Sequence, residues 1–201
     1  RELERGEEGV MFQPGKPGEL IERKICEPDI ALDYDTDSQF YKDMLGYESS
    51  DELAEALVNE YKEIYESIKK YKGFYVGRYE LSGTSEKPTM KAGSVISEIN
   101  WYEAKKACMN VIKENEAVKS TMIYGNQWDE IMNWLKNTKF KGQEEKVDED
   151  SNDWGNYYDY TVSMENIKVA PTGSKEEWSA NHLYDLAGNC REWTQEARYT
   201  N

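Results

Sequence analysis

The residues best suited to chemistry lie close together near the end of the chain, in Asn181–Thr194. Asp185, Asn189 and Glu192 carry oxygen-bearing side chains there. They surround Gly188, and a glycine followed by an asparagine predicts a sharp turn, because both residues tolerate left-handed backbone dihedrals. A turned backbone exposes carbonyl groups, and carbonyl and carboxylate oxygens are the ligands that calcium prefers. The alternative is a surface turn with solvated carboxylates, since the spacing lacks the strict pattern of an EF-hand.

The same stretch carries a longer pattern. Leu183–Asn189 reads Leu-Tyr-Asp-Leu-Ala-Gly-Asn, and Glu192-Trp193-Thr194 follows it. This closely resembles the signature of the formylglycine-generating-enzyme (sulfatase-modifying factor) family, whose usual form is Leu-Tyr-Asp/Asn-x-x-Gly-Asn-Val-Trp-Glu-Trp. The chain departs from that form at Cys190 and Arg191. The resemblance implies a C-type-lectin-like fold with little regular secondary structure and with bound calcium.

Other segments fit the same resemblance. They are the aromatic run Gly73–Leu81, the Asn100-Trp101 start of a helix, the Trp154-Gly155-Asn156 element and the turn Ala170–Gly173. The resemblance therefore covers 73–201, as a family domain that stops before the family's C-terminal segment, with 1–72 as an N-terminal extension. The expected fold class is α+β: a C-type-lectin-like domain with short strands, long loops and two or three helices, preceded by a helical extension.

The resemblance also implies a ligand set for calcium. The side chains of Asp185 and Glu192 would bind the ion together with the backbone carbonyls of Gly188 and Cys190. Because Cys190 would use its carbonyl, its side chain is free to differ from the family's. A second calcium loop of the family would fall near Asn156. Hydrogen bonds from backbone amides are the alternative use of the same carboxylates.

Hydrophobic periodicity predicts the elements that position these residues. An amphipathic helix is expected over 51–71, with a Ser or Asp N-cap, an apolar face and a stop at Gly73. A strand is expected over 73–81, in which Arg78 and Glu80 pair across the sheet or with the later motif. Asn100 and Glu103 form a capping box that opens a second helix, and Tyr124–Trp128 opens a third. The apolar faces expected for the three helices comprise Leu53, Leu57, Tyr61, Ile64 and Ile68; Trp101, Ala104, Cys108, Val111 and Ile112; and Trp128, Ile131, Met132 and Leu135.

Composition limits the partners. A net charge of −15 argues against a nucleic-acid partner, because phosphate binding requires basic residues. No apolar run is long enough to span a bilayer, so membrane insertion is not expected, and the first residues do not form a signal peptide.

Acidic loops are expected at 29–37 and 139–153, and both are interpreted as solvated. The spacing of the three cysteines, Cys26, Cys108 and Cys190, matches neither a zinc site nor a redox dithiol. Three buried thiols are expected, and one disulfide with a leftover thiol is the alternative.

Two classes of function remain open. The family's oxidases use two closely placed cysteines that bind copper, and none of the three cysteines of this chain matches them. Related members use an iron site that includes a histidine, but the single histidine here, His182, is expected at the surface or in packing. The chain is therefore read as a non-enzymatic module for a protein or carbohydrate ligand, with no catalytic residue assigned. The resemblance suggests a bacterial or prophage member, such as a surface or phage-tail protein or the variable protein of a diversity-generating retroelement, and hence an extracellular, cell-surface or virion location. The alternative is an oxidase whose catalytic cysteines lie beyond Asn201; a longer sequence would discriminate the two.

Overall fold

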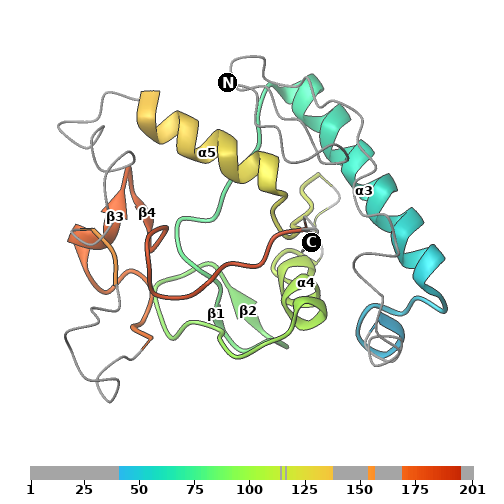
Figure 1. Ribbon diagram of the computed structural model, residues 1–201, viewed down its shortest axis with the longest axis horizontal. Coiled ribbons are helices and arrows are strands. Elements are labelled where there is room, and N and C mark those ends of the chain that lie inside the picture. Colours follow the sequence, from blue (N-terminus) through green and yellow to red (C-terminus); the bar gives the residue numbers. More distant parts are fainter. Residues whose placement is uncertain (1–40, 114, 116, 138–153, 157–168, 196–201) are drawn as a thin grey trace, which may run out of the picture. The chain divides into compact units, whose positions relative to one another are not determined.

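The computed structural model describes residues 41–113, 115, 117–137, 154–156 and 169–195. Within these residues the protein is a mixture of helices and small antiparallel sheets, as the α+β expectation requires (Figure 1). The chain divides into two compact units, each of which is described by itself. The first contains 1–75, 123–130 and 194–201; the second contains 76–122 and 131–193. Cys26 and the acidic loops expected at 29–37 and 139–153 lie outside the described residues.

The first unit is built on α3, Ser50–Tyr71, which follows a π-helical turn at Tyr41–Leu45 (Figure 1). The helix begins where the Ser49 hydroxyl accepts a hydrogen bond from the Glu52 amide at 3.2 Å, which satisfies one of the unpaired amides of a helix start. It ends at Lys72, whose φ of 64° is left-handed and whose N–H donates to the Ile68 carbonyl. The predicted helix is confirmed, although Lys72 rather than Gly73 takes the left-handed conformation.

The apolar face of α3 packs against the segment 123–130. Leu53, Leu57 and Tyr61 are buried, while Ile64 and Ile68 are only half-buried. The Tyr124 ring meets the Tyr61 ring edge-on at 4.9 Å between centroids, and its hydroxyl donates to the Leu57 carbonyl. The helical extension therefore buries its apolar face against residues that follow it in the chain by more than sixty positions.

The second unit holds two small hairpins and α4. β1, Ser82–Gly83, pairs with β2, Pro88–Thr89, and β3, Ser179–Ala180, pairs with β4, Leu183–Tyr184; a short 3-10 helix, Glu176–Trp178, precedes β3. The loop between β3 and β4 consists of Asn181 and His182 with φ of 53° and 65°, which is a type I′ turn whose twist suits a two-residue hairpin. This tight turn fixes where the signature segment starts.

α4, Trp101–Asn110, starts with the predicted capping box: Asn100 and Glu103 exchange two hydrogen bonds of 2.9 Å. Its predicted apolar face is only partly correct. Ala104 is buried, but Trp101 and Cys108 are half-buried, and Tyr102, Lys105 and Ala107 are buried instead. The Lys105 ammonium lies 6.0 Å from the centre of the Trp101 ring, so a long apolar stem and a cation–π contact place a lysine inside.

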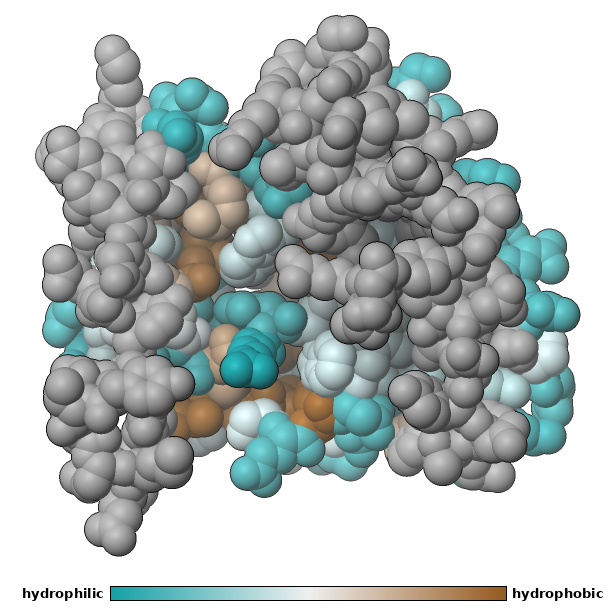
Figure 2. Space-filling view, in the orientation of Figure 1, coloured by the Kyte–Doolittle hydropathy of each residue, from teal (hydrophilic) through white to brown (hydrophobic). Residues whose placement is uncertain are grey.

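α5, Gly125–Asn137, is the third predicted helix, and it belongs in part to each unit. Ile131 and Leu135 are buried as expected, whereas Trp128 and Met132 are half-buried. No helix of the described residues is long and apolar enough to cross a membrane. In the view of Figure 2, the hydrophobic areas of the described residues are small and interrupted by hydrophilic side chains.

The strand predicted over 73–81 is wrong: ladder pairing begins only at Ser82. The backbone groups just before it bond elsewhere. The Arg78 carbonyl accepts from the Tyr184 amide at 2.9 Å, and the Glu80 amide donates to the Thr172 hydroxyl at 3.2 Å. Since these partners belong to loops and a hairpin end, no regular ladder forms, although the segment still contacts the later motif.

Candidate functional site

The signature segment is a turned backbone and not a helix. After β4, Asp185, Gly188 and Asn189 have φ of 60°, 78° and 58°. Residues that tolerate the left-handed region suit such positions best, and Gly, Asn and Asp tolerate it more readily than most. The turn predicted from Gly188 and Asn189 is therefore confirmed, and a left-handed Asp185 adds to it.

Asp185 is almost completely buried, with 1% of its surface exposed. Its Oδ2 atom accepts hydrogen bonds from the Thr172 hydroxyl at 2.8 Å and from the Gly173 amide at 3.0 Å. Its Oδ1 atom is buried and has no hydrogen-bond partner among the described residues. A buried carboxylate oxygen without a partner is costly, so this atom is suited to receive a cation or a water.

Asn189 holds four segments together. Its Oδ1 accepts from the Asn156 side-chain amide and from the Ala170 backbone amide, each at 2.9 Å. Its Nδ2 donates to Glu80 Oε2 at 2.5 Å and to the Ala170 carbonyl at 3.2 Å. Glu80 also accepts the Cys190 amide at 3.3 Å. The expectation that Glu80 pairs with the later motif is confirmed.

Gly188 lies directly against the backbone of Asn156. The two residues form a parallel bridge, and the Asn189 amide donates to the Asn156 carbonyl at 2.9 Å. A Cβ atom on Gly188 would come within 2.7 Å of that carbonyl oxygen, closer than such atoms can approach. Asn156 therefore binds the signature segment through its backbone and its side chain, and Trp154, two residues earlier, is buried.

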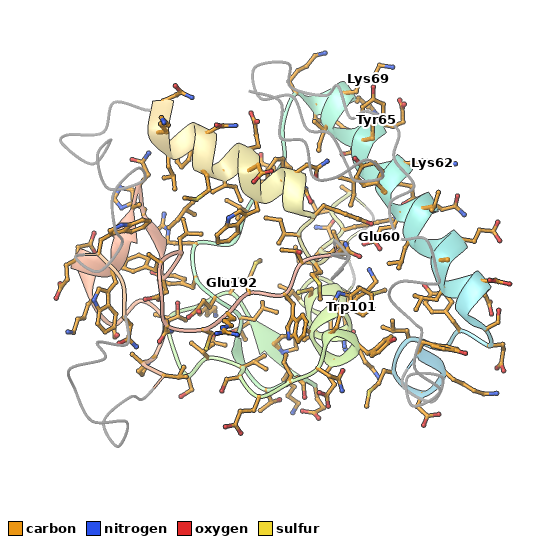
Figure 3. All side chains as sticks on the ribbon, in the orientation of Figure 1. Glu60, Lys62, Tyr65, Lys69, Trp101 and Glu192 are labelled. Carbon is orange, nitrogen blue, oxygen red and sulfur yellow. The ribbon has the colours of Figure 1, made fainter. Side chains whose placement is uncertain are left out.

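Glu80, Asp185 and Glu192 form an acidic group beside Cys190, and Figure 3 labels Glu192 on the segment that follows β4. Burial, with repulsion from Asp185 as a smaller cause, raises the pKa of Glu80 to about 7, although the hydrogen bond from Asn189 acts in the opposite direction. Although Glu192 as a whole residue is exposed, burial of its carboxyl group raises its pKa to about 8; a hydrogen bond from its own backbone acts in the opposite direction, and repulsion from Glu80 and Asp185 adds a smaller share. Burial raises the pKa of the Cys190 thiol to about 11, and the three carboxylates add to it.

These shifts predict how stability depends on pH in metal-free buffer. The folded protein keeps protons on Glu80 and Glu192 from the ordinary pKa of 4.5 up to about 7 and about 8, whereas the unfolded chain releases them near 4.5. The folded form thus binds more protons in this window, and the free energy of unfolding is expected to fall as pH rises through it. The share of Glu80 is on the order of 2 kcal/mol.

Urea unfolding at several pH values, with a chelator present, measures this dependence. Glu80→Gln should flatten the curve between pH 4.5 and 7, while Glu177→Gln, at an exposed position, should leave it unchanged. Equal slopes for the wild type and Glu80→Gln would contradict the prediction.

The residues expected to bind calcium are thus partly brought together. Asp185, Gly188, Cys190 and Glu192 lie on one turned segment, and Asp185 and Glu192 are close enough to interact electrostatically. Asn156 is adjacent, but its carbonyl already accepts an amide. Among the described residues no three His, Cys, Asp or Glu side chains form a metal-binding group. The expected site would use only two acidic side chains and two backbone carbonyls, so this absence does not decide it, and calcium stays a prediction. The unpaired Oδ1 atom of Asp185 is the feature that fits a bound calcium ion.

The structure also shows where the histidine, two of the cysteines and Thr172 lie. His182 is exposed in the hairpin turn, in line with a surface residue. Cys108 and Cys190 are half-buried, and neither forms a disulfide with another described residue. Sequence reasoning gave Thr172 no role, although it links the amide of Glu80 to the carboxylate of Asp185. The only signal for it was its place in the turn Ala170–Gly173.

Comparison of the chain with protein-family models found no match, and comparisons with curated proteins and with solved structures found no significant match either.

Proposed function

We propose that this chain is a non-enzymatic ligand-binding module of the formylglycine-generating-enzyme type, with a C-type-lectin-like fold whose signature loop binds calcium. The observation that carries the proposal is the buried, half-paired carboxylate of Asp185 inside a loop of left-handed residues. Such a loop exposes backbone carbonyls beside carboxylates, and these are the kinds of oxygen ligand that calcium prefers. The ligand is a protein or a carbohydrate at the surface.

The raised pKa values support a cation at this place. Glu80 and Glu192 repel each other and are repelled by Asp185, so a divalent ion beside them would favour their ionised forms and lower the pKa values of Glu80 and Glu192. The hydrogen bonds of Asn189 hold Glu80 in position without neutralising it, since an amide carries no charge. A bound ion that links loops would stabilise a domain whose strands share few backbone hydrogen bonds.

The oxidase alternative needs a reactive thiolate pair, and Cys190 is poorly suited to it. With a pKa of about 11 the Cys190 thiol stays protonated at neutral pH in the metal-free protein, which makes it a weak nucleophile. Titration with copper(I) against a competing chelator tests this point. In a longer form of the chain that extends beyond Asn201, tight dithiolate binding of copper(I) would favour the oxidase, and no uptake would favour the binding module.

Thermal melting with calcium and then with a chelator tests the cation site. Because a ligand that binds only the folded form stabilises it, calcium at about one hundred times its Kd should contribute about 2.7 kcal/mol. For a chain of this size that corresponds to a rise in Tm of about 5–10 °C. Magnesium should have a smaller effect, because it prefers octahedral geometry and retains its water.

Glu192→Gln removes one proposed ligand and should abolish most of the calcium-dependent shift. The matched control is Glu177→Gln, an exposed change of the same kind outside the loop, which should keep the full shift. A Tm that does not respond to calcium in the wild type would overturn the cation site.

A further inference from the structure

The segment Gly73–Gly77, which follows α3, has unused backbone hydrogen-bonding groups. Before it, the Lys72 N–H donates to Ile68; after it, the Arg78 carbonyl accepts from Tyr184. Within the described part of the chain, no hydrogen bond involves the residues between them. None of them has a positive φ, and Figure 1 draws them as a coil without helical turns. Their backbone groups are therefore available to a neighbouring strand.

The same segment exposes large apolar side chains. Tyr75 is 100% exposed and Val76 is 41% exposed, and Tyr71, at the end of α3, is 68% exposed. Tyr and Val, with the neighbouring Phe74, are residues with high β propensity. Free backbone groups next to adjacent exposed apolar residues are the features that peptide-binding sheet edges share.

The charges that flank the segment indicate what kind of strand would pair with it. Although the chain has a net charge of −15, Lys69, Lys70 and Lys72 precede the segment and Arg78 follows it, and all four are exposed. Figure 3 labels Lys69 near the end of α3. Basic residues at both ends favour a partner with acidic ends.

A second copy of the chain fits less well. If two copies paired antiparallel about Tyr75, Lys72 of each would face Arg78 of the other. Like charges directly opposite each other in a strand pair are destabilising. The strong net negative charge adds repulsion between copies.

We propose that Gly73–Gly77 is a docking strand for an extended peptide with an apolar, β-prone centre and acidic ends. The peptide pairs with the free backbone groups, packs its own side chains beside Tyr75 on one face and Val76 on the other, and places its acidic ends near the flanking lysines and Arg78. The segment shares no residue with the signature loop, so the proposal does not depend on the cation site, and either can fail without the other.

The test uses a fluorescently labelled peptide, Glu-Asp-Val-Thr-Val-Thr-Val-Asp-Glu, and fluorescence anisotropy with the whole chain at low salt. Saturable binding is expected, and it should weaken as salt rises. A peptide with lysine at both ends should bind about tenfold more weakly. A peptide N-methylated at alternate residues on its pairing edge should lose binding, because it lacks the donors of the ladder.

The matched protein variants are Tyr75→Pro and Tyr75→Val. Proline removes an amide and fixes φ, so affinity should fall about tenfold or more; valine keeps the backbone and the β propensity, so affinity should stay within about threefold. If the unmodified and N-methylated peptides bind the wild type equally, or if neither binds, the proposal is wrong. A dimer in sedimentation velocity that Tyr75→Pro abolishes would instead assign the segment to a second copy.

Discussion

Gly188→Ala is expected to destabilise the second unit by about 3–5 kcal/mol, a large share of the roughly 5–15 kcal/mol that stabilises an ordinary domain. Two causes add together. The residue has a φ of 78°, which costs a side-chain-bearing residue energy, and its new Cβ would lie 2.7–2.9 Å from the O, C and N atoms of Asn156. Those atoms belong to the backbone and cannot rotate away, so the parallel bridge must break.

Urea unfolding followed by tryptophan fluorescence measures this effect, because Trp154 lies buried next to the bridge. Two controls separate the causes. Gly46→Ala shares a positive φ of 81° but meets nothing within 4 Å, so it should cost only about 1 kcal/mol. Gly93→Ala has no such φ, and its nearest neighbour would be at 3.7 Å, so it should be nearly neutral. A Gly188→Ala protein as stable as the Gly46→Ala protein would show that the bridge with Asn156 is not tight.

Asp185→Ala is expected to cost about 2–4 kcal/mol. It leaves the buried Thr172 hydroxyl and the Gly173 amide without their acceptor, and it places alanine at a φ of 60°. Loss of one negative charge partly offsets the cost, because Asp185 repels Glu80 and Glu192. Asp185→Asn keeps an acceptor and tolerates the left-handed backbone, so it should cost about half as much.

Chemical unfolding in the presence of a chelator measures both changes without the contribution of a metal. The exposed change Glu177→Ala serves as the control and should stay within about 0.5 kcal/mol of the wild type. An Asp185→Ala protein within 1 kcal/mol of the wild type would mean that Thr172 and Gly173 find other partners.

Local signals predicted much of the helical structure. The capping residues Ser49 and Asn100 each precede a helix that starts where the sequence places it, because capping depends on neighbouring residues alone. The turn at Gly188 was predictable for the same reason. The inward face of α4 was not, since burial of Lys105 depends on the shape of its surroundings and on the ring of Trp101.

The strand expected over 73–81 shows the limit of local reasoning. Its composition has strong β propensity, but a strand also needs a partner, and among the described residues its backbone meets single acceptors and donors rather than a ladder. The roles of Glu80 and Thr172 could not be predicted from local sequence either. Glu80 lies 109 positions before Asn189 in the chain, and sequence spacing carries no information on such a contact.

The bonding of Asn189 also limits which amino acid can occupy that position. The side-chain oxygen of Asn189 accepts two hydrogen bonds, and its side-chain NH₂ group donates two, so the amide is fully paired. Aspartate would lack both donors and bring another negative charge beside Glu80, and glutamine would overshoot by one methylene group. Cys190, in contrast, holds Glu80 through its main-chain amide. The chain therefore has freedom to diverge at position 190, where any residue except proline offers the same amide, and almost none one residue earlier.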